Sequence, residues 1–197
     1  MKLFFSLDDP DLVELINSGG IGVIPSDTVY GLVASASNRQ AVERMYALKH
    51  REKKPGTTIA ASTDQLIHLG IPPADLTKAA KLWPNPLSII LTPNESFSYI
   101  HQGKGASPFR VVKDATISSL LSKTGPLVTT SANEPGQPTA VDITEAQKFF
   151  GENVDFYVDG GLIGERPPST IIRFTEDGGI ELIRQGAVVI TDSGEIE

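Results

Sequence analysis

The chain has 197 residues, 40% of them hydrophobic and 21% charged, which is typical of one globular domain, here expected over residues 1–197. Its net charge of −7 argues against bulk attraction to nucleic acid or anionic membranes, and the lack of a signal peptide or membrane-spanning apolar run favours a cytoplasmic protein. The absence of cysteine excludes disulfide scaffolds, thiolate zinc sites and thiol nucleophiles, and three scattered histidines do not suggest a metal cage.

The hydrophobic pattern predicts helices and strands that alternate along the chain. Helices are expected over residues 8–17, 38–50, 63–69, 74–82, 114–122 and 144–150. Strands are expected over residues 21–24, 57–62, 87–91, 108–112, 127–130 and 156–158, with a closing hairpin over 169–174 and 180–183 and a loop over 94–107. This order predicts an α/β fold with a mixed sheet, because the closing hairpin argues against a wholly parallel one.

Small polar side chains follow several of the predicted strands. Residues 26–28 (Ser-Asp-Thr) follow the strand over 21–24, residues 129–133 (Thr-Thr-Ser-Ala-Asn) follow Val128, and Ser169-Thr170 follow two prolines. Hydroxyls and an amide at strand ends suit a polyoxygenated ligand. For residues 26–28 a helix N-cap is an equally good interpretation, because all three are capping residues. No histidine is placed to act as a base, so a serine hydrolase triad is poorly supported.

A second group of candidate residues is cationic. Lys49 and Arg51 lie two residues apart where the helix over 38–50 ends, and such a pair suits a triphosphate and a carboxylate together. A solvated helix end is the alternative, because the helix dipole favours cations there. For Lys53 and Lys54 we favour that alternative. Arg110 lies within an apolar strand and therefore needs either a ligand or a structural salt bridge.

The sequence contains neither a Walker loop nor a GxGxxG motif, so a nucleotide would bind in a cavity of side chains and strand ends. Asp27, Asp114, Asp142 and Asp159 could each assist a magnesium ion, but their spacing selects none of them.

Seven segments, taken together in order and spacing, resemble the YrdC/Sua5 family over about Gly20 to Gly186. They are PSDTVYGL (25–32), the K-x-R of residues 49–51, WPNPLSIIL (83–91), SANEPGQPTA (131–140), DGG (159–161), PSTII (168–172) and IRQGAV (183–188). The length is similar to that of single-domain, TsaC-like threonylcarbamoyl-AMP synthases.

The resemblance implies an activity and a fold. Members of this family combine L-threonine, bicarbonate or CO2, and ATP into threonylcarbamoyl-adenylate and pyrophosphate. A partner enzyme then uses the product to form t6A at adenosine 37 of tRNA. The implied fold is YrdC/RibB-like, a twisted mixed sheet with flanking helices around a large cationic cavity. ATP is thus expected as a substrate, with Mg²⁺ accompanying it.

The resemblance also assigns roles to the residues singled out above. Lys49 and Arg51 match a catalytic pair that faces the phosphates and the carboxylate. The threonine-binding residues would be Thr28, Arg110 and Thr170, and the ATP-binding residues would be Lys49, Arg51, Ser131, Asn133 and Arg184.

Some positions depart from the family pattern. Residues 49–52 read Lys-His-Arg-Glu where the family has K-G-R-P, and Asn85 replaces a glycine. These departures bear on the activity more than on the fold, and they leave two alternatives open. One is a YrdC-like protein that binds tRNA or double-stranded RNA. The other is a nucleotide-binding paralogue with a different substrate.

Overall fold

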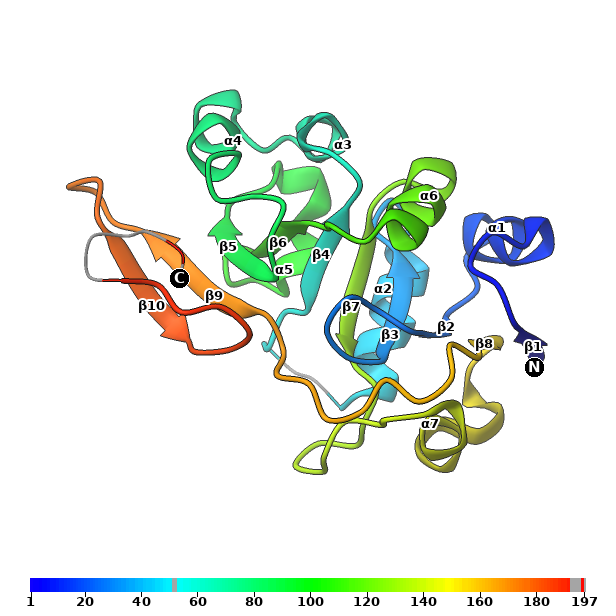
Figure 1. The fold of residues 1–197 in the computed structure, drawn as a ribbon. Helices are drawn as coiled ribbons and strands as arrows, with labels where there is room; N and C mark the ends of the chain where they lie inside the picture. Colours follow the sequence, from blue (N-terminus) through cyan, green and yellow to red (C-terminus); the bar gives the residue numbers. More distant parts are fainter. Residues whose placement is uncertain (51–52, 192–195, 197) are drawn as a thin grey trace.

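The computed structural model describes residues 1–50, 53–191 and 196, which form one ten-stranded sheet with helices packed around it (Figure 1). The strands are β1 (Lys2–Phe4), β2 (Gly22–Ile24), β3 (Gly31–Ser35), β4 (Thr57–Ala60), β5 (Leu87–Leu91), β6 (Ser107–Val111), β7 (Leu127–Ser131), β8 (Phe156–Val158), β9 (Thr170–Phe174) and β10 (Ile180–Arg184). Their order across the sheet is β1-β8-β2-β3-β7-β4-β6-β5-β9-β10.

Side-chain caps define where most of the longer helices begin. The helices are α1 (Pro10–Asn17), α2 (Arg39–Leu48), α3 (Thr63–His68), α4 (Pro73–Ala79), α5 (Ser98–His101), α6 (Ala115–Thr124) and α7 (Ile143–Phe150), with 3₁₀ turns η1 (Glu95–Phe97) and η2 (Gly151–Asn153). Asp9, Asn38, Asp114 and Asp142 accept backbone N–H groups at the starts of α1, α2, α6 and α7, which satisfies donors that the helix itself leaves unpaired. A search of the described helices finds none with the length and apolarity needed to span a bilayer.

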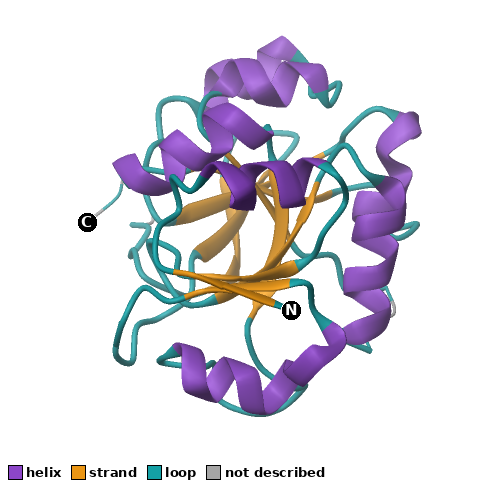
Figure 2. Ribbon diagram, turned by 90° about the vertical axis from the view of Figure 1, so that its right-hand side faces the viewer, coloured by secondary structure: helices purple, strands orange, loops and turns teal. Residues whose placement is uncertain are grey.

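The sheet carries a hydrophobic core on each face, because successive strand residues point to opposite sides. Ile24 of β2 and Val33 of β3 belong to the core under α1 and α6. Their neighbours Val23 and Leu32 belong to the larger core, which also contains Met45 of α2. Figure 2 shows the helices on both sides of the strands. Burial on both faces explains why β2 and β3 consist of apolar and small residues without a polar face.

The predicted mixed sheet with a closing hairpin is confirmed. β2 runs parallel to β8 but antiparallel to β3, and β9 and β10 form the antiparallel hairpin at one edge. The sequence analysis missed two strands, β1 and β3, and wrongly treated all of residues 94–107 as a loop, since η1 and α5 lie there. β3 was missed because Gly31 follows a cluster of turn-forming residues, although its five residues are all buried between β2 and β7.

Strand direction brings several chain segments to one edge of the sheet. β2, β7 and β8 end at this edge, because β3 is antiparallel to both β2 and β7, while β8 is parallel to β2. β3 and β4 begin there, since each is antiparallel to β7. The loops that follow residues 24, 131 and 158 therefore meet the segment that precedes β4, and this meeting point forms the site described next.

Candidate active site

A polar cavity of about 190 Å³ lies at this edge of the sheet. Its walls come from the β2–β3 loop, the start of β4, the end of β7, strand β6 and the β9–β10 hairpin. The residues that line it include Ser26, Thr28, Gly56, Arg110, Thr130, Ser131, Thr139, Ser169 and Arg184. Small hydroxyl side chains and two arginines thus face the same space, from segments far apart in the sequence.

Ser26 shapes the β2–β3 loop. Its Oγ accepts the N–H groups of Thr28 at 3.2 Å and Val29 at 3.1 Å and lies 3.1 Å from the Thr28 hydroxyl. Strand β3, not a helix, follows this loop, so the N-cap interpretation of residues 26–28 is wrong. The serine instead closes a local turn, and this turn holds the buried Thr28 in the cavity wall.

Lys49 joins two of the motifs. It caps the C-terminal end of α2, its side chain is only 3% exposed, and its Nζ donates to Ser131 O at 2.9 Å and to Asn133 Oδ1 at 2.8 Å. It also donates to the backbone oxygen of Asn133, and the Ser131 hydroxyl donates to Asn133 Oδ1 at 2.8 Å. The solvated-helix-end interpretation is therefore wrong for Lys49. The ammonium group lies beside the S-x-N segment and close to the Phe150 ring, 5.7 Å away.

Arg110 is buried in β6 with an ion pair on one side only. Its Nη2 donates to Asp27 Oδ1 at 2.8 Å, while its buried Nε and Nη1 have no acceptor among the described residues. Burial lowers the pKa of the guanidinium and Asp27 opposes that shift, so the group stays charged. The structural salt bridge considered from the sequence is thus present. It leaves donors for an anion in the cavity that Arg110 lines.

The predicted residues Thr170 and Arg184 hold the wall formed by the β9–β10 hairpin. The Thr170 hydroxyl is buried; it donates to Val188 O at 2.6 Å and accepts the N–H of Gly186 at 3.0 Å. Its neighbour Ser169 lines the cavity, and Arg184 Nη2 donates to Ser169 O at 2.6 Å. Thr170 therefore supports this wall from behind, while Ser169 lines the cavity with its Oγ 2.9 Å from the buried Ser88 hydroxyl.

Gly186 in the IRQGAV segment is needed where the chain passes closely behind this wall. A Cβ at this position would lie 2.5 Å from the carbonyl carbon of Ser169 and 2.6 Å from Thr170 N. Gly186→Ala is expected to lower the free energy of unfolding by about 2 kcal/mol, because backbone atoms cannot move aside as a side chain can. Urea unfolding would measure this effect. The exposed neighbour Ala187, changed to serine, is the control and should unfold like the unaltered protein.

Two further residues support the site: Tyr30, which the sequence analysis did not single out as functional, and Asp27. The Tyr30 hydroxyl donates to Gly161 O at 2.8 Å and accepts Gly160 N–H at 2.9 Å, which ties the DGG segment to the β2–β3 loop. Burial raises the pKa of Tyr30, so the hydroxyl keeps its proton. Asp27 was considered with Ser26 and Thr28 as a strand-end or helix-cap residue, and separately as a metal ligand, but not as the partner of Arg110. For Tyr30 the available signal was its place inside the PSDTVYGL segment.

Arg51, the second residue of the predicted catalytic pair, lies outside the described residues. The four candidate magnesium ligands have separate local roles: Asp27 binds Arg110, Asp114 and Asp142 cap α6 and α7, and Asp159 accepts the N–H of Gly161. Among the described residues no group of three or more histidine, aspartate or glutamate side chains could hold a metal ion.

Comparison with known proteins places this fold and site in a family. A family model for Sua5, YciO and YrdC proteins, described as "Telomere recombination", matches residues 14–186. The chain belongs to the Sua5/YciO/YrdC family. A family member from Marinobacter nauticus, named threonylcarbamoyl-AMP synthase, is 34% identical over 165 residues, which cover 81% of this chain and 87% of the relative.

Solved structures of the family share the architecture. The P. abyssi Sua5 structure in complex with L-threonine has a TM-score of 0.84 and 26% sequence identity, with 95% of this chain and 58% of that chain covered. The present chain thus spans somewhat more than half the length of that relative. E. coli YciO has the same fold, with a TM-score of 0.83 and 22% sequence identity. The match covers 98% of this chain and 100% of the YciO chain.

Proposed function

We propose that this protein is a threonylcarbamoyl-AMP synthase, which joins L-threonine, bicarbonate or CO2, and ATP into threonylcarbamoyl-adenylate and releases pyrophosphate. The observation that carries the proposal is the contact of Lys49 with Ser131 and Asn133 beside a cavity into which Arg110 brings unpaired donors. A cation next to a hydrogen-bonding corner suits phosphates, and a buried guanidinium with free donors suits a carboxylate. The family membership and the names of the relatives support the same reaction.

The small cavity suits the amino acid. Its volume of about 190 Å³ is below the roughly 300–1,000 Å³ of sites that enclose drug-sized ligands, so it would hold threonine while most of ATP lies outside. In this proposal Arg110 binds the carboxylate of threonine, and Thr28 contributes the hydroxyl of the β2–β3 loop. Ser169 forms part of the cavity wall, and Thr170 serves the subsite by holding that wall from behind.

ATP would bind at the outer side of this cavity. Ser131 and Asn133 would contact the nucleotide, with Lys49 holding both in place and adding positive charge near the phosphates. Arg184 would extend the cationic lining from the hairpin, and Arg51 would complete the pair with Lys49. Since the described carboxylates form no metal cluster, Mg²⁺ would enter on the phosphates of ATP, as it commonly does.

The chemistry then depends on position and charge more than on a nucleophilic side chain. The amine of threonine attacks CO2, forms the C–N bond and loses a proton, which gives a carbamate. A carbamate oxygen attacks the α-phosphorus of ATP, and the bond to the bridging oxygen breaks so that pyrophosphate leaves. Arg110 and Lys49 offset the negative charge that gathers when carboxylate, carbamate and triphosphate share one site.

The test is a pyrophosphate-release assay with each substrate omitted in turn. Release that requires ATP, L-threonine and bicarbonate together supports the proposed reaction. Tight ATP binding without threonine-dependent release would overturn it in favour of a paralogue with another substrate. In the proposed pathway a partner enzyme uses threonylcarbamoyl-adenylate to form t6A in tRNA. This partner enzyme and any direct binding of RNA stay predictions.

A further inference from the structure

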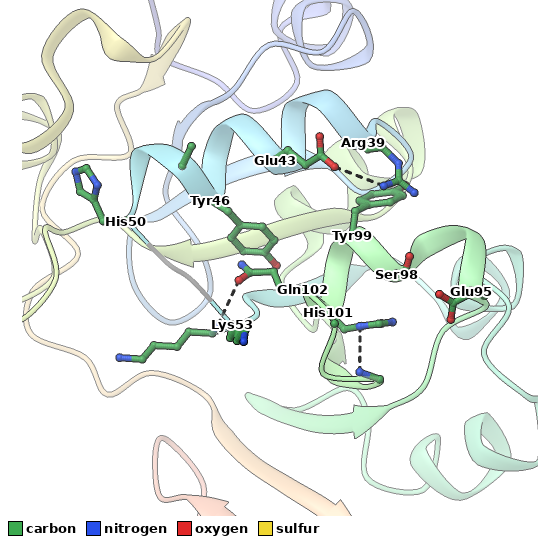
Figure 3. A pocket seen from close by; sticks show the side chains of 14 residues that line it. Arg39, Glu43, Tyr46, His50, Lys53, Glu95, Ser98, Tyr99, His101 and Gln102 are labelled. Atoms are coloured by element: carbon green, nitrogen blue, oxygen red, sulfur yellow. Dashed lines mark hydrogen bonds and ion pairs between the residues drawn. The ribbon is translucent and has the colours of Figure 1, made fainter.

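A second, larger cavity of about 1110 Å³ lies beside helices α2 and α5, and we call it the α2–α5 cavity (Figure 3). The residues of interest in its lining are Arg39, His50, Lys53, Lys54, His101 and Gln102. It is separate from the candidate active site, and one chain segment, residues 53–57, lies between the two cavities. Lys53 and Lys54 line the α2–α5 cavity, and residues 55–57, which follow directly, line the active-site cavity.

Hydrogen-bond donors gather in this cavity. The Oε1 of Gln102 accepts the N–H of Lys54 at 3.3 Å, which identifies the oxygen end of the amide. Its Nε2 is consequently a donor, and it is buried without an acceptor in the described part of the chain. His101 Nδ1 accepts the N–H of Gly105 at 3.1 Å, so the proton of the neutral ring is on Nε2. Both side chains thus offer donors and suit a ligand rich in acceptors.

Positive charge gathers at the end of the cavity near His50. Lys53 and Lys54 form no ion pair with any carboxylate that the structure describes, although the whole chain carries a net charge of −7. Of the two acidic residues in the lining, Glu43 is paired with Arg39 at 3.5 Å. Glu95 lies at the opposite end from Lys53 in Figure 3. A local cationic surface in an acidic protein favours an anionic ligand.

The shape of the cavity favours an elongated anion. Arg39 at the start of α2 and His50 just beyond its end both line it, and the ten residues of α2 rise about 15 Å. A single phosphate would fill only part of this length. We propose that the α2–α5 cavity binds an oligophosphate group, either free or carried by a nucleotide, with Lys53, Lys54 and the Gln102 amide as its main contacts.

A side chain connects the proposed site to the active site. The Tyr46 hydroxyl donates to Ile100 O at 2.7 Å and accepts the N–H of Gly56 at 3.0 Å. Tyr46 lines the α2–α5 cavity, whereas Gly56 lines the active-site cavity. An oligophosphate bound here would therefore lie against Lys53 and Lys54, which directly precede the active-site residues 55–57. The binding itself does not depend on the proposed reaction.

The experiment is calorimetric titration of tripolyphosphate into the unaltered protein and into Lys49→Met, which alters the proposed nucleotide site but no residue that lines the α2–α5 cavity. We expect Lys49→Met to retain one bound equivalent. The double variant Lys53→Gln/Lys54→Gln should weaken this binding by about tenfold or more. Gln102→Glu should weaken it at least as much, because it keeps an oxygen that accepts Lys54 N–H, removes the donor and adds a negative charge that repels the ligand.

Lys78→Gln/Lys81→Gln is the matched control, since it removes the same charge from lysines that line a different pocket, beside α4. It should bind tripolyphosphate like the unaltered protein. Titrations of ADP and of pyrophosphate test whether the oligophosphate group is free or carried by a nucleotide. Tighter binding of ADP than of pyrophosphate assigns the site to a nucleotide. Equal or weaker binding of ADP assigns it to a free oligophosphate.

Three results would overturn the proposal. They are no binding by the unaltered protein, an equal loss in the control variant, and disappearance of the signal in Lys49→Met. The proposed reaction fails independently, through absence of threonine-dependent pyrophosphate release.

Discussion

Lys49→Met is expected to lower threonine-dependent pyrophosphate release by about 100-fold or more, the effect of removing a positioned charge from a site where negative charge develops. The ammonium group is buried and donates to Ser131 and Asn133. Methionine retains the length of the side chain and its packing against Phe150. It removes one donor from each of three oxygen acceptors, of which Ser131 O and Asn133 Oδ1 keep another, and this loss should also lower the free energy of unfolding by about 1–3 kcal/mol.

Activity and stability have to be measured together to interpret this variant. Lys148→Met on the exposed surface of α7 is the control, because it makes the same change of residue away from the cavity. It should leave both quantities unchanged. A folded Lys49→Met protein with full activity would contradict the assignment of Lys49 to the nucleotide site and remove the mechanism proposed above.

The sequence predicted the elements of this fold better than their contacts. Hydrophobic periodicity located most helices and strands, since burial on one face or two leaves a local pattern. The meeting of Lys49 with Ser131 and Asn133 joins residues more than 80 positions apart, and it depends on how β7 packs beside β3 and β4. No local pattern contains that information, so family resemblance alone suggested the pairing.

Two neighbouring residues show a second limit of prediction from the sequence. Both Ser169 and Thr170 are hydroxyl residues at the start of β9, and the sequence analysis chose Thr170. Side chains alternate between two sides of a strand, and a shift of one residue exchanges them. In the structure Ser169 lines the cavity and its hydroxyl lies 2.9 Å from that of Ser88, whereas the Thr170 hydroxyl donates to the backbone of Val188. The α2–α5 cavity was not predicted either, because the helix α5 that bounds it was taken for a loop.

Arg110 and Asp27 allow a structural contribution to be separated from substrate binding. Arg110→Met is expected to lower the free energy of unfolding by about 3 kcal/mol, because it leaves the largely buried Asp27 carboxylate without its partner. The double variant Asp27→Asn/Arg110→Met removes both charges and should recover much of that stability. Urea unfolding of the two variants and of the unaltered protein measures the difference.

Activity should not recover with stability in the double variant. If the free Nε and Nη1 donors of Arg110 bind the carboxylate of threonine, both variants lose this contact. We expect threonine-dependent pyrophosphate release at least about 100-fold below that of the unaltered protein in each, since a lost charge-assisted contact costs roughly 1.5–3 kcal/mol and misplaces the amine as well. Asp27→Asn alone retains the guanidinium and should keep more activity than either variant. A double variant with an unchanged KM for threonine would show that Arg110 serves only the fold.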